Sequence, residues 1–465
     1  MAHFDLLIIG GGSGNSILTP EFDSWNVAMV ERGPLGGTCL NVGCIPSKML
    51  VLPAERVIEA AESAAIGVHV PEPTVDWPSI RDRIFGRIDA IVEGGTDYRR
   101  GQENVTYFEG DARFVGERRV SISLDSGGTE EVSVDRVVLA AGARPIIPDV
   151  PGLSGTPFHT SDTIMRVDRL PERLAILGGG FIAAELGHVF SALGSKVTII
   201  HRRAQMLRHE DEEVSERFTE VFRDRVDLRL CTHPSAVSFS DGEFRIELVA
   251  EDSPTVIDVD TTTIVSDALL VTTGRQPNGV QLNVAATGVN LDSAGYVLTD
   301  RTLRTSAEGI WALGDIRNPR QLKHLANQEA RVVTHNLLHP QEPISISQDV
   351  IPSAVFSHPQ VGSVGEREQD LRATGRRYVV GRCDYAGVAY GWALEDSTGF
   401  AKVLIDPESL EILGGHVIGS QAATLSQQLV QAMTFGITAD RLAREQIWCH
   451  PALPEVIENA LLDAL

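Results

Sequence analysis

Short apolar runs that end at glycine-rich turns mark the first two thirds of the chain. Residues 5–9 form one such run and lead directly into the turn 10–15, and a second run, 27–30, ends at Glu31. Continuous apolar runs bounded by glycine are typical of parallel strands that are buried on both faces. The pattern therefore predicts a strand, a glycine turn, a helix and a second strand at the N-terminus.

The same pattern returns later in the chain. Residues 174–177 lead into the turn 178–183, and the apolar run 196–200 follows. Two further runs, 137–141 and 268–273, each enter a glycine turn. We interpret these two turns as the crossings between domains, so that the second unit of this kind interrupts the first.

The chain changes character from about residue 348. The runs 402–405 and 412–418 predict strands of an antiparallel sheet, and 426–436 and 454–465 have helical spacing. We therefore expect an α/β protein with two Rossmann-like nucleotide-binding domains and a C-terminal α+β domain. The expected domains are residues 1–150 with 272–345, then 151–271, and then 346–465.

The first glycine turn matches the dinucleotide-binding fingerprint. Its glycines allow the backbone to approach a pyrophosphate, and Glu31, about 20 residues further on, can accept hydrogen bonds from ribose hydroxyls. The third position of the fingerprint is Asn15 instead of Gly or Ala, so close packing of helix on strand is less certain there. The predicted cofactor-binding residues of this unit are Gly10, Gly12, Ser13, Gly14 and Glu31.

The second fingerprint differs in the charge that follows its second strand. His201, Arg202 and Arg203 stand there, and Arg208 comes soon after. An acid at this place would repel a 2′-phosphate, whereas arginine binds one bidentately, so this unit is predicted to take NADPH. A single fingerprint is weak evidence, but two copies with opposite charges imply hydride transfer between two cofactors. The predicted residues here are Gly178, Gly180, Phe181, Ile182, Arg202 and Arg208.

Composition excludes several classes of function. The 465 residues are 43% apolar and 22% charged, and 63 acidic against 40 basic residues give a net charge of −23. Nucleic acids and anionic membranes require a positive surface, so neither is an expected partner. The N-terminus has no basic leader, and no apolar run reaches the roughly 18 residues of a membrane span, so we expect a cytoplasmic protein.

Two of the five cysteines, Cys39 and Cys44, follow the first nucleotide unit and are five residues apart. They fit a structural disulfide, half of a metal site or a redox pair. A reducing cytoplasm disfavours the first, and the absence of a second cysteine pair disfavours zinc, so no metal is expected. A following helix would favour the thiolate that redox chemistry needs.

In all these features the chain resembles the FAD-dependent pyridine-nucleotide disulfide oxidoreductases, the group that contains glutathione reductase and dihydrolipoamide dehydrogenase. The resemblance implies that the first domain binds FAD and the third forms a homodimer. It implies that Cys44 contacts the flavin, that Cys39 attacks a small-molecule disulfide, and that Lys48 pairs with Glu185 beside the flavin. It adds Gly37, Thr38, Gly142, Gly274 and Asp315 to the cofactor-binding residues, with Asp315 on the ribityl chain.

The motif that begins at His450 and Pro451 near the C-terminus carries the same resemblance. A lone histidine near a terminus is usually structural, but in this family it is the acid–base catalyst, and a glutamate five residues on orients it. The matching residues are His450 and Glu455, and the histidine serves the dicysteine site of the other subunit. A proton donor with a pKa near neutrality assists the departing thiol.

Several stretches resemble the branch of the family that reduces mycothiol disulfide. They include Asn15 in its turn, the segments 323–331 and 384–396, and the C-terminal residues 451–462. They imply that disulfide as substrate. Glutathione disulfide, a quinone-reductase or diaphorase activity, and a non-catalytic subunit of a larger complex remain alternatives, and the aromatic residues near 390 fit core packing equally well.

Overall fold

The computed structural model describes residues 1–250, 263–347 and 350–465 and separates into two compact units. Unit 1 comprises Met1–Pro46, Arg81–Ile146 and Gly274–Ser347, and unit 2 comprises Ser47–Ile80, Ile147–Thr273 and Gln348–Leu465. Unit 1 thus collects three separate stretches of the chain, and the segments expected to bind NADPH and to dimerise both belong to unit 2. The division into three domains stays a prediction.

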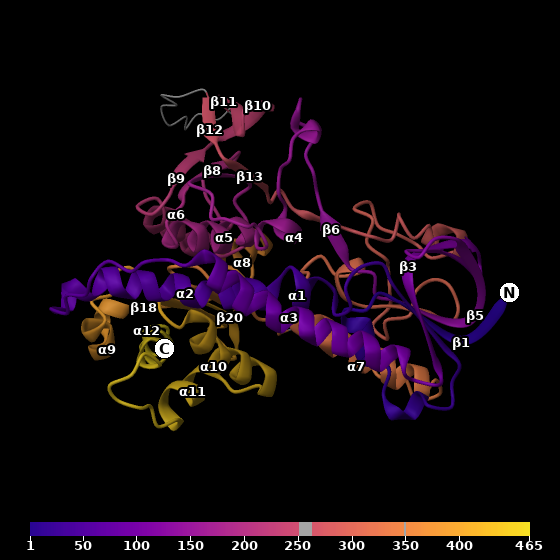
Figure 1. Ribbon diagram of the computed structural model, residues 1–465. Helices are drawn as coiled ribbons and strands as arrows, with labels where there is room; N and C mark the ends of the chain where they lie inside the picture. Colours follow the sequence, from indigo (N-terminus) through magenta and orange to yellow (C-terminus); the bar gives the residue numbers. More distant parts are fainter. Residues whose placement is uncertain (251–262, 348–349) are drawn as a thin grey trace. The chain divides into compact units, whose positions relative to one another are not determined.

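Unit 1 is built on a mostly parallel sheet (Figure 1). The first strand pairs in parallel with the second and fifth, and the fourth strand is antiparallel to the third and fifth. Consecutive residues of the first two strands are buried, so both faces of these strands are covered, as the continuous apolar runs predict. The strands are β1 (Ala2–Ile9), β2 (Val27–Glu31), β3 (Val105–Gly116), β4 (Arg119–Leu124), β5 (Thr129–Leu139) and β15 (Ile310–Ala312).

The two crossings of the chain form a small antiparallel ribbon in unit 1. Strand β6 (Ala143–Pro145) pairs with β14 (Arg275–Pro277), and the Ile146 amide donates to the Gly274 carbonyl at 2.9 Å. The two glycine turns therefore lie side by side, as expected for neighbouring crossings. The helices of unit 1 include α1 (Gly37–Asn41) and α7 (Lys323–Leu338), while α2 (Cys44–Glu62) and α3 (Trp77–Arg100) continue from one unit into the other.

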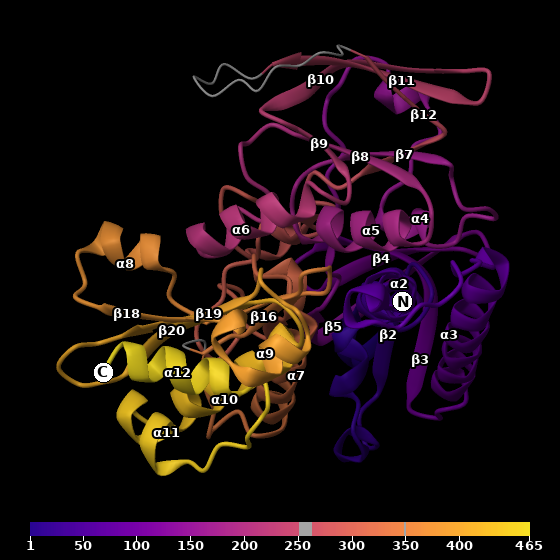
Figure 2. The ribbon, with the colours of Figure 1, turned by 90° about the vertical axis from the view of Figure 1, so that its left-hand side faces the viewer.

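Unit 2 contains a parallel four-stranded sheet with helices on one face and an antiparallel three-stranded sheet on the other (Figure 2). The parallel strands are β13 (Ala268–Val271), β7 (Arg173–Leu177), β8 (Lys196–His201) and β9 (Asp227–Leu230), and the antiparallel ones are β10 (Thr232–Ser240), β11 (Glu243–Ala250) and β12 (Thr263–Ser266). The helices are α5 (Phe181–Ala192) and α6 (Glu212–Phe222), with the short α4 (Ser161–Ile164).

The C-terminal part of unit 2 is the expected antiparallel sheet covered by helices (Figure 2). Its strands run in the order β16 (Ser353–Val355), β17 (Val361–Gly365), β20 (Ile412–Ile418), β19 (Phe400–Ile405) and β18 (Val379–Asp384). Its helices are α8 (Glu368–Thr374), α9 (Ala389–Ala393), α10 (Ala422–Phe435), α11 (Ala439–Glu445) and α12 (Glu455–Asp463).

A buried ion-pair cluster joins the two parts of unit 2. The ammonium of Lys402, 2% exposed, lies 2.9 Å from Asp211, 3.2 Å from Glu213 and 2.6 Å from Glu368. Burial raises the pKa of Glu368, but the hydrogen bond and charge of Lys402 lower it further, and the pKa ends below its ordinary value. This carboxylate therefore stabilises the fold above its unfolded pKa, and the contribution is lost as the pH falls through the folded value.

We expect Lys402→Met to lower the free energy of unfolding by about 3–5 kcal/mol at pH 7, because the variant leaves buried carboxylates without their cation. The loss should shrink near pH 4, where the carboxylates take up protons. Urea denaturation followed by circular dichroism at both pH values measures it. The matched variant Lys196→Met, at an exposed position, should stay within about 0.5 kcal/mol of the wild type. A Lys402→Met protein as stable as that control would contradict the prediction.

Candidate functional site

The glycine turn after β1 lies against the loop that leads to the cysteines. Gly10 has a φ of +109°, and a Cβ there would lie 2.3 Å from the Ala140 carbonyl oxygen. The Gly36 amide donates to the Gly11 carbonyl at 3.0 Å, and a Cβ at Gly37 would lie 2.8 Å from Cα of Gly12. Two glycine segments thus approach backbone to backbone, and a side chain at these places would fill the space that a pyrophosphate needs.

Glu31 ends β2, where the fingerprint requires an acid. Its two carboxylate oxygens accept from the amides of Gly11 at 2.6 Å and Gly33 at 3.0 Å. Burial raises the pKa of Glu31, and these backbone hydrogen bonds oppose that shift. A carboxylate has lone pairs for further donors, so Glu31 could also accept hydrogen bonds from the hydroxyls of a ribose.

The helix predicted after the first glycine turn is present, but it is short and of the 3₁₀ type. Ser13–Ile17 forms a short 3₁₀ helix, and Pro20–Phe22 forms another. The Arg99 guanidinium donates to the side-chain oxygen of Asn15 at 2.7 Å and to its carbonyl at 2.8 Å. In an α-helix that carbonyl would instead accept from the amide four residues further along the chain. Pro20, which has no amide hydrogen, would in any case end an α-helix here.

Close packing at this turn is nevertheless kept. A Cβ at Gly14 would lie 2.8 Å from the Cβ of Ala140 and 3.0 Å from Cγ2 of Ile8. Gly14 thus allows the approach to the strands that the third fingerprint glycine usually allows. Sequence reasoning missed Arg99, which is 6% exposed and stands at the far end of α3. No local sequence motif indicates the contact of Arg99 with Asn15.

Asp315 lies in a short turn directly after β15. The residue is only partly exposed, and the start of α7 lies beside it. Burial raises the pKa of Asp315, while the charges of Arg275 and Lys323 lower it. Gly142, at the first crossing, has a φ of +63°, and its carbonyl accepts from the Asn278 amide at 3.1 Å.

Cys39 and Cys44 lie on two consecutive helices. Cys39 is in α1, and Cys44 is the first residue of the 19-residue α2. A helix N-terminus favours a negative charge, so this position favours thiolate at Cys44. Lys48 follows one turn later on the same helix. Only Cys44 thus stands at a helix start, and the redox role of the two cysteines stays a prediction.

Lys48 and Glu185 form the pair that the resemblance implies. The Lys48 ammonium lies 2.7 Å from each carboxylate oxygen of Glu185, on α5, whose side chain is 6% exposed. The Phe356 amide also donates to Glu185 at 3.0 Å, and the Lys48 ammonium lies 4.8 Å from the centre of the Phe356 ring. Phe356 fixes this pair from a third segment, and nothing in its sequence context pointed to it.

The second glycine turn has the features of a nucleotide loop. Gly178 has a φ of +124°, and a Cβ at Gly179 would lie 2.6 Å from the His201 ring. Gly180 precedes α5, where Phe181 and Ile182 are the first helical residues and Phe181 is 48% exposed. Gly178 thus lies close to the backbone of Thr272, and Gly179 lies close to the His201 ring. The space beside Gly180 is open.

Three arginines follow β8, as the sequence predicts. The Leu207 amide donates to the Gly179 carbonyl at 2.8 Å, so the segment that carries Arg202, Arg203 and Arg208 folds back to the glycine turn. Burial, with a smaller effect of these charges, lowers the pKa of His201 to about 4, so this histidine is neutral near pH 7. Within the described part of the chain the three guanidinium groups form no ion pair with a carboxylate.

His450 and Glu455 are joined as expected. Nδ1 of His450 donates to Glu455 at 2.8 Å, and the other carboxylate oxygen accepts from the Ala452 amide at 3.0 Å. The hydrogen bond from His450 lowers the pKa of Glu455. The His450 side chain is 72% exposed in the single chain. The glutamate therefore orients a histidine whose ring is open to a second molecule.

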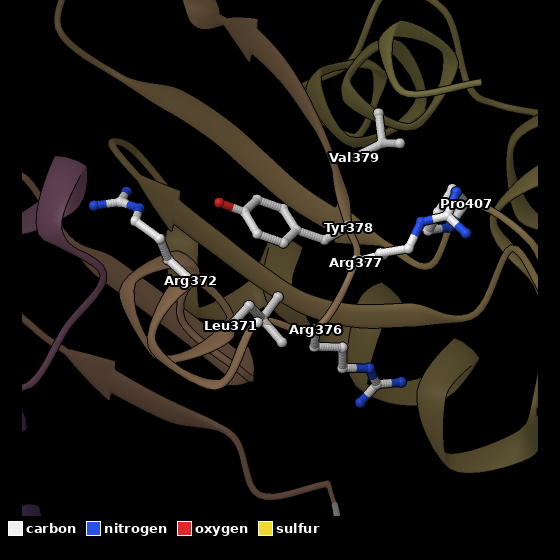
Figure 3. A pocket seen from close by; sticks show the side chains of 8 residues that line it. Leu371, Arg372, Arg376, Arg377, Tyr378, Val379 and Pro407 are labelled. Carbon is white, nitrogen blue, oxygen red and sulfur yellow. The ribbon is translucent and has the colours of Figure 1, made fainter.

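A surface pocket of about 460 Å³ lies at α8 and β18 and holds none of these residues (Figure 3). Its arginines are already paired: Arg372 with Glu368 at 3.4 Å, Arg376 with Glu411 at 3.7 Å, and Arg377 with Glu408. The pocket therefore offers no unpaired arginine to an anion.

Among the residues that the structure describes, no cluster of three His, Cys, Asp or Glu could hold a metal ion, and none of the helices described is long and apolar enough to cross a membrane.

The chain belongs to the pyridine nucleotide-disulphide oxidoreductases. That family's model matches residues 4–330, and the model of its dimerisation domain matches residues 351–461. Mycothione reductase of Mycobacterium tuberculosis is 46% identical over 471 residues, which cover 99% of each chain. Dihydrolipoyl dehydrogenase of Haloferax volcanii is 30% identical over 99% of this chain and 96% of its own.

Among solved structures, the HOCl-induced flavoprotein disulfide reductase RclA from Escherichia coli matches with a TM-score of 0.84. It is 25% identical over 98% of this chain and 99% of its own. The fold class and the enzyme class predicted from the sequence are thus confirmed: the protein is a flavin-dependent disulfide oxidoreductase with a C-terminal dimerisation domain. Its cofactors, FAD and a nicotinamide dinucleotide, are those of the family.

Proposed function

We propose that the protein reduces mycothiol disulfide to two molecules of mycothiol at the expense of NADPH. The similarity to mycothione reductase of Mycobacterium tuberculosis, 46% over almost the entire length of both chains, carries this assignment of the substrate. The arginines after β8, at a place where an NAD-binding site carries an acid, support NADPH as the electron donor. A cytoplasmic location, as the sequence predicts, fits a reaction driven by NADPH.

The residues described above divide between the two cofactors. The turn at Gly10–Gly14, the segment at Gly37 and Thr38, and Glu31 would hold the nucleotide part of FAD, and Asp315 would hold its ribityl chain. The turn at Gly178–Gly180 and Arg202 with Arg208 would hold NADPH. When bound, FAD carries two electrons from NADPH to the disulfide of Cys39 and Cys44.

The chain's own groups then complete the reaction. The Cys39 thiolate attacks one sulfur of the substrate disulfide, a mixed disulfide forms, and the first thiol leaves with a proton from His450. The Cys44 thiolate next attacks Cys39, which releases the second thiol and restores the cysteine disulfide. In sum, one disulfide, one NADPH and one proton give two thiols and NADP⁺.

A homodimer would complete this site. His450 is exposed within the segment that matches the dimerisation-domain model, and Glu455 holds its ring in one orientation. We propose that each dicysteine site takes its histidine from the second copy of the chain, so that two composite sites form per dimer. Lys48 and Glu185 would stand next to the flavin as an ion pair, with Glu185 holding the ammonium in place.

The purified yellow protein should oxidise NADPH with mycothiol disulfide and not with glutathione disulfide. Turnover with glutathione disulfide alone would overturn the substrate and keep the mechanism. If NADPH bleaches the flavin, neither disulfide is reduced and a quinone is, the protein is a diaphorase. Alkylation of the thiols after reduction by NADPH separates a disulfide reductase from a diaphorase, because only the disulfide reductase needs free thiols for turnover.

Replacing Arg202 and Arg208 by glutamine should raise KM for NADPH about 10- to 100-fold and leave KM for NADH within about threefold. Hydrogen bonds between charged groups are worth about 1.5–3 kcal/mol, and only NADPH carries the 2′-phosphate that these arginines would bind. Steady-state kinetics with both nucleotides measures the ratio. Arg223→Gln, at an exposed position of the same unit, is the matched control. Equal loss with both nucleotides would remove the arginines from phosphate recognition.

A further inference from the structure

One lysine outside the fingerprint stands at the glycine turn of unit 1. Lys323 is the first residue of α7, and its ammonium lies 2.8 Å from Oγ of Ser13. Its charge also lowers the pKa of Asp315. Lys323 is therefore placed between the turn expected to hold the diphosphate of FAD and the acid expected to hold its ribityl chain.

The glycine turn itself lacks part of its usual charge. In a typical nucleotide site a long α-helix begins at the turn, and its N-terminus stabilises the phosphates. Here the turn is followed by five residues of 3₁₀ helix, whose course is set by Arg99 and Asn15. A helix of this length contributes little of that stabilisation, since the effect depends on aligned peptide dipoles.

We propose that Lys323 supplies the missing positive charge and binds the diphosphate of FAD. The inference rests on the proposed function, because it takes Gly10–Gly14 as the FAD turn. The ammonium at Ser13 is one hydrogen bond from that turn, and it is only partly exposed, so its attraction for a phosphate is less screened than that of a surface lysine. The hydrogen-bond partner of the Lys323 ammonium is a neutral hydroxyl, so this hydrogen bond does not neutralise its positive charge.

The dissociation constant of FAD tests the proposal independently of activity. Holoenzyme of the wild type, Lys323→Met, Lys323→Arg and the matched control Lys196→Met is diluted, and released FAD is measured by its fluorescence over a range of salt concentrations. Lys323→Met should raise Kd about 10- to 100-fold, as expected for one charge-assisted contact. Lys323→Arg should recover most of the affinity, and Lys196→Met should leave it unchanged.

The salt dependence separates charge from mere packing. Wild-type Kd should rise with salt, and the Kd of Lys323→Met should depend on salt less steeply, because the screened contact is gone. If Lys323→Met binds FAD as tightly as the wild type, or keeps the wild-type salt dependence, Lys323 is no phosphate ligand. FAD binding without disulfide reduction would overturn the proposed function and leave the role of Lys323 standing, and a wild type that binds no FAD would overturn both.

Discussion

Replacing Cys39 by serine is expected to abolish disulfide reduction while FAD stays bound with a wild-type spectrum. Turnover with mycothiol disulfide should fall by more than about 10³-fold, because a serine hydroxyl does not exchange with disulfides as a thiolate does. NADPH should still bleach the flavin, since none of the nucleotide-binding residues changes. Steady-state NADPH oxidation and the flavin absorption spectrum together measure both effects.

The matched control is Cys449→Ser. Cys449 is exposed, has the same side chain and belongs to no helix start, so its variant should keep turnover within about twofold of the wild type. Two outcomes would contradict the thiol mechanism: a Cys39→Ser enzyme with normal turnover, or one that loses its flavin along with its activity. The second would show that Cys39 supports cofactor binding instead of the reaction.

His450→Ala is expected to slow turnover by about 10²- to 10⁴-fold, the usual contribution of a general acid–base group. Substrate-free reduction of the flavin by NADPH should be unaffected, because His450 acts on the thiol that leaves the substrate. His69→Ala is the control, since His69 is also exposed in unit 2. A His450→Ala enzyme within twofold of the wild type would exclude this histidine from the mechanism.

The pH profile tests the role of Glu455. The hydrogen bond from His450 lowers the pKa of Glu455, so this carboxylate stays ionised to lower pH. Glu455→Gln removes the carboxylate that titrates beside the ring, so the profile of turnover against pH should differ from that of the wild type. A Glu455→Gln profile that coincides with the wild type would mean that Glu455 does not orient or charge the histidine.

The first nucleotide unit shows where sequence reasoning succeeds and where it stops. The strands β1 and β2, the acid Glu31 and the two crossings were all predicted, because each depends on spacing within a few tens of residues. A helix was predicted after the turn, and the structure shows it as a short 3₁₀ helix. Its course depends on Arg99, which is 84 residues from Asn15 in the chain, and no local pattern contains that contact.

The exposed surface shows a second limit. The segment near residue 390 fitted core packing or a substrate pocket equally well, yet Trp392 is 63% exposed and Tyr390 is 39% exposed in the single chain. An aromatic residue at helical spacing has the same sequence signature whether it faces a core, a partner or solvent. Only the position of α9 outside the sheet of unit 2 separates these cases.

The sequence by itself determined the class of the protein. Two glycine turns after apolar strands, opposite charges after the second strand of each, and a cysteine pair five residues apart are local patterns whose chemistry follows from residue type and spacing. The tertiary structure alone decided which distant groups meet. Arg99 reaches Asn15 across 84 residues and Lys323 reaches Ser13 across 310, because contacts of this kind depend on how packed elements bring separate segments together, which spacing along a chain does not encode.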